Sequence, residues 1–260
     1  LWDNLSGITT NKNLAHNFYW KYRDLISDRE AEAFRGTYRQ KALVSKSDQH
    51  RCPCHDRLPE TDRPVVLFLG QVYTDSSLVF GIGEWRTPIT ILEKLCRWCN
   101  ARDYQLVVKL HPKEKEGGNP INRNANDKLT YRKIQESEAL IDLLRENRAI
   151  IDSENVFNTY ELIQLASVAV TVNSQAGLEA ALLGKPVVVA GDAFYGGLGF
   201  TLDAPEPHLL DHQMDAARIF RVPGTAAKFG CIFFERYCRE KTPAALLSLI
   251  QESLSLTKNK

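Results

Sequence analysis

The sequence has no long apolar run and no marked excess of either charge. No stretch reaches the roughly 20 apolar residues of a membrane-spanning helix, and residues 1–10 lack the charged start and apolar middle of a signal peptide. The first residue is not Met, so we expect the chain to have been cut from a longer one. The 33 Lys and Arg residues against 32 Asp and Glu residues give a formal net charge of +1. This balance argues against a strongly basic nucleic-acid-binding protein, and we expect no nucleic-acid partner.

Three common catalytic motifs are also missing. There is no Walker A loop for a nucleoside triphosphate. Gly81 and Gly83 lack the third glycine and the helix start of a dinucleotide-binding fingerprint. Ser174 lacks the flanking glycines of a nucleophile elbow, so the sequence does not indicate a Ser-His-Asp hydrolase.

Cysteine is too sparse for a disulfide scaffold, because the 260 residues contain only six. One interpretation is a zinc site formed by Cys52, Cys54 and His55 together with Cys96 and Cys99. Cys96 and Cys99, however, share the apolar face of a helical pattern, whereas structural zinc pairs usually sit on tight turns. We therefore favour buried, reduced thiols of a cytosolic protein.

The most informative stretch is a buried strand, a polar turn, a short helix and a second buried strand. The β-branched run 168–172 predicts an interior strand, which small polar residues then end. Residues 177–183 predict a helix, with Gly184 after its C-terminus, and 187–190 predict the second strand. This order is typical of a βαβ unit, in which the turn after the first strand is a usual ligand-binding position.

Strands alternate with helices along the rest of the chain. Further strands are expected at 64–69, 106–110 and 149–151. Polar loops are expected at 72–86 and 196–207. Expected helices span 13–26, 28–43, 88–101, 131–147, 158–166, 212–220, 225–240 and 242–256. The alternation predicts an α/β fold with a doubly wound, parallel, Rossmann-like sheet and flanking helical segments. The expected division is a helical lead-in and linker (1–62), an α/β nucleotide-sugar-binding domain (63–205) and C-terminal helices packed on it (206–260).

Three polar clusters follow three of the predicted strands. The first is Gly70 and Gln71 with Asp75, Ser76 and Ser77, the second is Lys109, Leu110, His111 and Pro112, and the third is Asn173, Ser174, Gln175, Gly177 and Glu179. Because the carboxyl ends of parallel strands lie along one edge of a sheet, the three clusters can converge on one ligand.

His111 is the candidate catalytic residue. Pro112 holds the backbone before it extended, and an imidazole in this place can hydrogen-bond or protonate a leaving phosphate. The alternative is a histidine that bonds a neighbouring loop carbonyl. Lys109 can neutralise a diphosphate or carboxylate, or simply reach solvent from the end of its strand.

Ser174 and Gln175 are candidate phosphate ligands. They can act together with the N–H groups and the dipole of the helix that follows. The alternative is a plain helix cap made by Ser174 or Asn173. Glu179 can accept hydrogen bonds from ribose hydroxyls, or it can serve only as a favourable charge near the helix N-terminus.

Together these clusters resemble the capsule polysaccharide biosynthesis/export family, the bacterial β-Kdo transferases. The matching stretches are 68–72 (FLGQV), 75–77 (DSS), 108–112 (VKLHP), 171–180 (TVNSQAGLEA), 184–187 (GKPV), Gly191, 194–195 (FY) and 199–201 (GFT). The resemblance covers roughly residues 64–205, and donor-binding domains of sialyltransferases and teichoic-acid polymerases are similar. It implies a GT-B glycosyltransferase whose C-terminal α/β domain binds the donor CMP-Kdo, with no metal and no cofactor.

The resemblance also implies roles for individual residues. His111 would contact the donor phosphate and assist the departure of CMP. Ser174 and Gln175 would hold the phosphate, Glu179 would hold the ribose, and the loop of Gln71 and Asp75 would face the cleft between domains. The same stretches add further expected donor-binding residues, namely Ser76, Lys109, Pro112, Asn173, Gly177 and Tyr195.

A GT-B enzyme needs a second α/β domain for its acceptor, and residues 1–62 are too few to form one. We therefore expect the donor half of a larger capsule-polysaccharide glycosyltransferase, which would need an acceptor domain or a partner protein for activity. The alternative within the same family is a single-domain relative. The acceptor would be a glycolipid or an oligosaccharide. The alternatives are a non-catalytic GT-B-like interaction module and a sugar-nucleotide epimerase of GT-B shape. The expected location is the cytoplasm, with peripheral association with the inner membrane as an open alternative.

Overall fold

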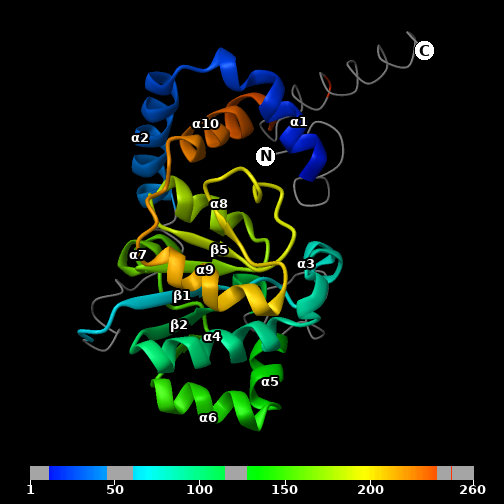
Figure 1. Cartoon of the computed structure of the whole chain (residues 1–260), viewed down its shortest axis with the longest axis vertical. Coiled ribbons are helices and arrows are strands. Elements are labelled where there is room, and N and C mark those ends of the chain that lie inside the picture. Colours follow the sequence, from blue (N-terminus) through cyan, green and yellow to red (C-terminus); the bar gives the residue numbers. More distant parts are fainter. Residues whose placement is uncertain (1–11, 46–60, 115–127, 239–246, 248–260) are drawn as a thin grey trace.

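The computed structural model describes residues 12–45, 61–114, 128–238 and 247 (Figure 1). Six strands form one sheet in the order β3-β2-β1-β4-β5-β6. Their bounds are β1 (Val65–Leu69), β2 (Gln105–Lys109), β3 (Ile150–Asp152), β4 (Val168–Thr171), β5 (Val187–Val189) and β6 (Leu202–Asp203). Every pairing is parallel. The predicted α/β fold with a doubly wound parallel sheet is therefore confirmed.

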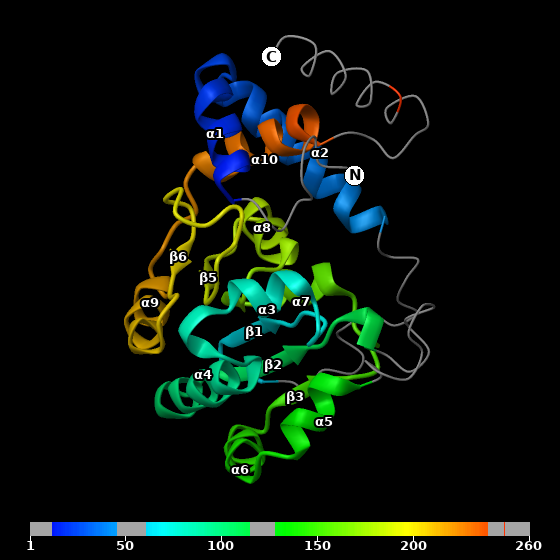
Figure 2. The same cartoon turned by 90° about the vertical axis from the view of Figure 1, so that its right-hand side faces the viewer.

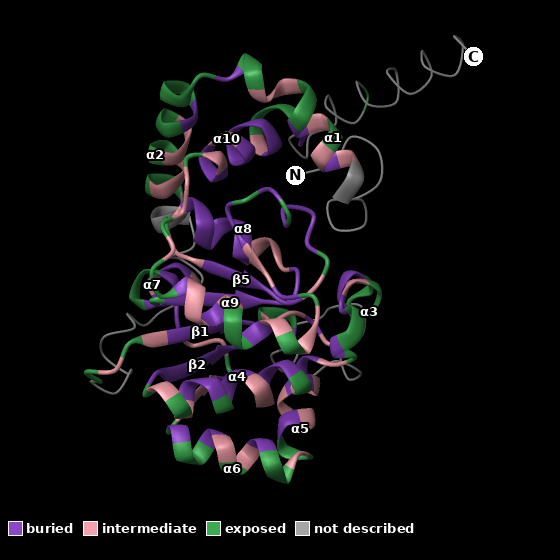
Figure 3. Cartoon of the chain, in the orientation of Figure 1, coloured by how far each residue is buried: buried purple, intermediate pink, exposed green. Residues whose placement is uncertain are grey.

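Helices cover both faces of this sheet, and successive strand residues point to opposite cores. Val66 and Phe68 of β1 pack in one core, and Leu67 and Leu69 pack in the other. The first core is covered by α3 (Ser76–Gly81), α4 (Pro88–Arg102), α5 (Leu129–Gln135), α6 (Glu138–Asn147) and α9 (Leu210–Ala217). The second is covered by α1 (Lys12–Tyr22), α2 (Asp28–Ser45), α7 (Thr159–Leu165), α8 (Gln175–Leu182) and α10 (Thr225–Ile232). Figure 3 shows that α8 is buried along most of its length, whereas α2 exposes one side.

Four expectations about local structure were wrong or incomplete. The expected helix 131–147 is two helices, because Ser137 leaves the helical conformation and its Oγ accepts the N–H of Leu140 at 3.3 Å. The expected loop 72–86 contains α3, and the expected loop 196–207 contains β6, a strand of two residues that is too short for a periodic signal. The expected helix 225–240 changes after α10 into one π-helical turn, Phe233–Tyr237. Most of the expected helix 242–256 lies outside the described residues.

The lead-in helices pack on the rest of the chain. Both α1 and α2 contact α10, and α2 also contacts α7 and α8. Figure 1 shows these helices together on one side of the sheet. None of the described helices is both long and apolar enough to cross a membrane. The domain boundaries after residues 62 and 205 stay predictions.

The pairing register brings three turns to one edge of the sheet. Leu69, the last residue of β1, pairs with Lys109 of β2 and with Thr171 of β4. The chain therefore leaves these three neighbouring strands at the same level. Figure 2 looks onto this edge, with α3 in front of it.

Candidate functional site

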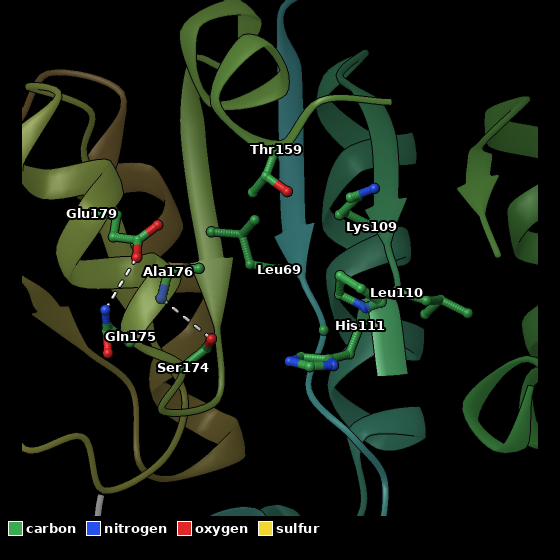
Figure 4. A pocket seen from close by; sticks show the side chains of 11 residues that line it. Leu69, Lys109, Leu110, His111, Thr159, Ser174, Gln175, Ala176 and Glu179 are labelled. Carbon is green, nitrogen blue, oxygen red and sulfur yellow. Dashed lines mark hydrogen bonds between the residues drawn. The ribbon is translucent and has the colours of Figure 1, made fainter. Parts of the chain in front are cut away.

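A pocket opens at this edge between α8 and the turn that follows β2 (Figure 4). Its lining residues are Leu69, Gly70, Lys109, Leu110, His111, Pro112, Thr159, Ser174, Gln175, Ala176 and Glu179. The pocket thus brings together residues from all three polar clusters, although Gly70 is the one that the first cluster contributes to this lining. The predicted residues that do not line it are Gln71, Asp75, Ser76, Asn173, Gly177 and Tyr195.

Thr159 is a lining residue that sequence reasoning missed. It is the first residue of α7, directly after Asn158, whose side chain caps that helix by accepting the N–H of Tyr160 at 2.9 Å. The helix follows β3, so its start lies at the same edge as the other turns. The sequence does carry a signal for Thr159: it is a polar residue at the start of a helix that follows a parallel strand, and such positions lie at the ligand-binding edge of a sheet.

The start of α8 forms one wall of the pocket. Ser174 is its N-cap, and the Ser174 Oγ accepts the N–H of Ala176 at 3.3 Å. The Ser174 main-chain carbonyl accepts the hydroxyl of Tyr195 at 2.6 Å. The Ser174 hydroxyl still has a hydrogen to donate, because a serine oxygen accepts and donates at once. The first turn of α8 also carries the positive end of the helix dipole, so this wall favours an anion.

Gly177 and Tyr195 support this turn from behind the pocket. A Cβ atom on Gly177 would lie 2.1 Å from the Tyr195 hydroxyl oxygen, so only glycine leaves room for the phenol. Burial, together with the charges of Asp203 and Glu179, raises the pKa of Tyr195, and the hydroxyl therefore stays a hydrogen-bond donor. The two residues act here in packing, although they were predicted to contact a donor.

His111 forms the opposite wall. Its Nδ1 accepts the main-chain N–H of Lys113 at 3.1 Å. A main-chain N–H can only donate, so Nδ1 carries no proton, and in the neutral ring the proton is on Nε2. Figure 4 shows the imidazole pointing into the space that separates it from Ser174. An Nε2–H group in this place can donate to an anionic oxygen in the pocket.

Glu114 fixes the turn that carries His111, and sequence reasoning missed this residue. Its carboxylate is buried and accepts the N–H of Tyr73 at 2.7 Å and the hydroxyl of Thr130 at 2.8 Å. Burial raises the pKa of Glu114, although these hydrogen bonds oppose the rise. The carboxylate links the loop after β1, the turn after β2 and the start of α5.

Lys109 lines the pocket at its base, but its charge is already paired. The side chain is 3% exposed, and Nζ lies 2.6 Å from Asp152 Oδ2. Nζ also donates to Asn155 Oδ1 and, at 2.8 Å, to the carbonyl of Phe157. The expectation that Lys109 reaches solvent is wrong, because the carboxylate of the neighbouring strand β3 holds the ammonium inside the protein.

Gln71 and Asn173 bind each other instead of facing the pocket. The Gln71 Nε2 donates to Asn173 Oδ1 at 2.7 Å, and the Asn173 main-chain N–H donates to Gln71 Oε1 at 3.1 Å. The Asn173 Nδ2 donates to the carbonyl of Ser77 at 2.7 Å. Asp75 is the N-cap of α3 and accepts the Ser77 N–H at 2.8 Å, while Ser76 is exposed outside the pocket. The Gln71 and Asn173 side chains thus join the turns after β1 and β4.

Glu179 places a nearly buried carboxylate in the pocket. Its exposure is 6%, and its Oε1 accepts the Nε2–H of Gln175 at 3.2 Å. The two residues lie one turn apart on α8, so they share one face of that helix. Carboxylate oxygens accept up to about four hydrogen bonds, which leaves capacity toward a ligand.

The zinc alternative has no support in the part of the chain that the structure describes. Cys96 and Cys99 are buried thiols in α4, as predicted. Burial raises the pKa of Cys96 to about 12 and raises the pKa of Cys99 as well. A protonated thiol is a poor metal ligand. Across these described segments no three His, Cys, Asp or Glu residues are grouped to hold a metal, while Cys52, Cys54 and His55 lie outside them.

Comparison with protein families identifies the chain. The family described as capsule polysaccharide biosynthesis protein matches residues 9–222. The chain belongs to this family. The match is longer than the stretch 64–205 that the sequence motifs indicated, because it also takes in α1, α2 and α9. No curated protein matches this capsule-family chain.

Solved structures with the same fold include two transferases from Thermosulfurimonas dismutans. The KpsC β-Kdo 2,7 transferase is 20% identical with a TM-score of 0.50, over 88% of this chain and 70% of that one. The KpsC β-Kdo 2,4 transferase is 19% identical with a TM-score of 0.48, and the match covers 77% of this chain and 55% of that transferase. A variant of the wall teichoic acid polymerase TagF is 16% identical with a TM-score of 0.40, and the match covers 86% of this chain and 52% of the polymerase chain. At 20% identity the likeness to the β-Kdo 2,7 transferase shows the α/β fold alone. The chain spans 55% of the KpsC β-Kdo 2,4 transferase.

Proposed function

We propose that the chain is the donor-binding half of a glycosyltransferase of capsule or surface polysaccharide synthesis. The proposed donor is a CMP-activated sugar, with CMP-Kdo as the first candidate. The observation that carries the proposal is the pocket itself: the N-terminus of α8 and His111 face each other across it in a member of the capsule family. The named activities of the two KpsC structures of similar fold agree with this proposal.

The charge of the lining residues favours a single phosphate over a diphosphate. Among the described lining residues, Lys109 is the cation of fixed charge, and its ammonium is bound to Asp152. An anion in the pocket is therefore stabilised by N–H and O–H donors and the helix dipole, not by an unpaired positive charge. A CMP-sugar carries one phosphate with one negative charge, which suits such a site without a metal.

The proposed reaction breaks the bond between the sugar carbon and the phosphate oxygen of the donor and forms a bond between that carbon and the acceptor oxygen. CMP leaves with the electron pair of the broken bond, and the proton of the acceptor hydroxyl is released to solvent. Ser174 and the first turn of α8 hold the phosphate, and Glu179 accepts the ribose hydroxyls. His111 donates its Nε2–H to a phosphate oxygen and stabilises the charge that grows on departing CMP. The acceptor hydroxyl, from a glycolipid or an oligosaccharide, is supplied outside this pocket by the acceptor half or by a partner protein. The proposed location is the cytoplasm or the cytoplasmic surface of the inner membrane.

Calorimetric titration of the chain with CMP, UDP and GDP tests the proposal. We expect CMP to bind at least about tenfold more tightly than UDP or GDP, and His111→Ala to weaken CMP binding by about tenfold or more. His208→Ala is the matched control, since His208 is exposed and does not line the pocket. A folded protein that binds none of the three nucleotides contradicts the proposal and favours the interaction module. A preference for UDP points instead to the epimerase.

A further inference from the structure

Side chains hold both main-chain groups of Ser174, the residue that caps α8 at the pocket. The Ser174 N–H donates to the Thr171 hydroxyl at 3.3 Å, and the Ser174 carbonyl accepts the Tyr195 hydroxyl at 2.6 Å. Thr171 and Tyr195 are both 0% exposed. The direction of the two peptide groups sets the direction of the Cα–Cβ bond between them. These two buried hydroxyls therefore control where the Ser174 side chain leaves the main chain.

The loop that carries Tyr195 is itself fixed to the rest of the protein. It joins β5 to β6, and the Asp203 carboxylate at its end accepts the N–H of Gly197 at 2.6 Å. Phe194 stacks on Phe233, which directly follows α10, with ring centroids 4.7 Å apart. The Tyr195 hydroxyl therefore has a defined position, and its hydrogen bond joins the start of α8 to this loop.

Gly177 lies inside α8 and makes room for this hydroxyl. A Cβ atom on Gly177 would lie 2.1 Å from the Tyr195 hydroxyl oxygen and 3.0 Å from Cζ, the ring carbon that bears it. Glycine destabilises a helix relative to alanine, and the shortest contact that an alanine would make here is with the hydroxyl. The hydrogen bond between Tyr195 and Ser174 is thus the feature that this glycine accommodates.

We propose that Tyr195 is a positioning residue whose hydroxyl orients Ser174 toward the phosphate of a bound nucleotide. The inference rests on the proposed function. Tyr195 does not line the pocket, so it acts through Ser174 and touches no ligand. The Ser174 carbonyl also accepts the Gly177 N–H at 2.9 Å, but that donor belongs to α8 and cannot anchor the helix to the loop. Without the Tyr195 hydroxyl, Ser174, which faces His111 across the pocket in Figure 4, would lose its fixed direction.

The test measures CMP affinity by calorimetric titration for Tyr195→Phe, alone and in two mutant backgrounds. The substitution keeps the buried ring and removes only the hydroxyl. We expect Tyr195→Phe alone to bind CMP about tenfold more weakly than the unchanged protein. In a Ser174→Ala background it should change the affinity by less than about twofold, because the hydroxyl that it orients is gone. In a Glu179→Gln background, which leaves Ser174 in place, it should keep its effect of about tenfold.

Two further variants separate positioning from packing. Tyr104→Phe removes a hydroxyl from a buried ring of the other core, outside the pocket, and should leave CMP affinity unchanged. Thr171→Val removes the other hydroxyl that holds Ser174, and it should weaken CMP binding with the same dependence on Ser174 even if Tyr195→Phe does not fold. No effect of Tyr195→Phe, or an equal effect alone and in both backgrounds, overturns the inference and leaves the proposed function standing. An unchanged protein that binds no nucleotide overturns both.

Discussion

The turns after β1 and β4 leave neighbouring strands at the same edge, yet they use their polar residues differently. After β4, Ser174, Gln175 and Glu179 line the pocket. After β1, Gly70 lines it, whereas Gln71 bonds Asn173 and Asp75 caps α3. A turn at the carboxyl edge of a parallel sheet has its backbone near the ligand site. Its polar side chains can nevertheless point away from that site.

The end of β2 and the turn after it contain both kinds of residue within three positions. His111 faces the pocket, and Lys109 turns inward to Asp152. Lys109 is the last residue of β2 and its ammonium binds Asp152 of the neighbouring strand β3, whereas His111 follows in the turn, where the chain has left the sheet. Residues that face inward should affect stability, and residues that face the pocket should affect ligand binding.

The largest expected effect is that of Lys109→Ala on stability. The substitution leaves the Asp152 carboxylate, whose side chain is 0% exposed, without its cation. We expect the free energy of unfolding to fall by about 3–5 kcal/mol, measured by urea denaturation. Lys113→Ala, at an exposed position beside the same turn, should change it by less than about 0.5 kcal/mol. A loss below about 1 kcal/mol for Lys109→Ala would show that the ion pair contributes little and that the ammonium can serve a ligand.

A smaller effect is expected from the amide pair that joins the turns after β1 and β4. Gln71→Ala removes both of its bonds to Asn173 and should lower the free energy of unfolding by about 1–3 kcal/mol. Its affinity for CMP should stay within about twofold of the unchanged protein, since Gln71 does not line the pocket. In a double-mutant cycle with Asn173→Ala the two losses should not add, because each substitution breaks the same pair. Strictly additive losses would contradict the pairing.

Much of the fold follows from local patterns, and for that reason the sequence predicts it. The buried strands are short, mostly apolar runs rich in β-branched residues, and their alternation with helices leaves few arrangements other than a parallel sheet. The capping roles of Ser174 and Asn158 follow from a small polar residue placed just before a helix. The convergence of three turns follows from parallel strands that end at one level.

The inward direction of Gln71 and Lys109 does not follow from local patterns. The partner of Gln71 lies 102 positions away, and the partner of Lys109 lies 43 positions away. The contact between α2 and α8 is equally distant in the sequence, because Arg39 donates to the carbonyl of Leu182, 143 positions away. Such long-range contacts form only in the folded protein, and they produce no periodic pattern in the sequence from which they could be predicted.

The smallest expected changes in stability come from a matched pair of helix caps. This pair directly tests the difference between the turns after β1 and β4. Asp75 caps α3 after β1, and Ser174 caps α8 after β4. Asp75→Ala and Ser174→Ala should each lower the free energy of unfolding by about 1 kcal/mol in urea denaturation, because each removes one cap. Only Ser174→Ala should weaken CMP binding, by about tenfold, because the Ser174 hydroxyl faces the proposed phosphate and the Asp75 carboxylate does not. If Asp75→Ala weakens CMP binding equally, the turn after β1 also contacts the ligand, and the division between inward and pocket-facing residues fails at this position.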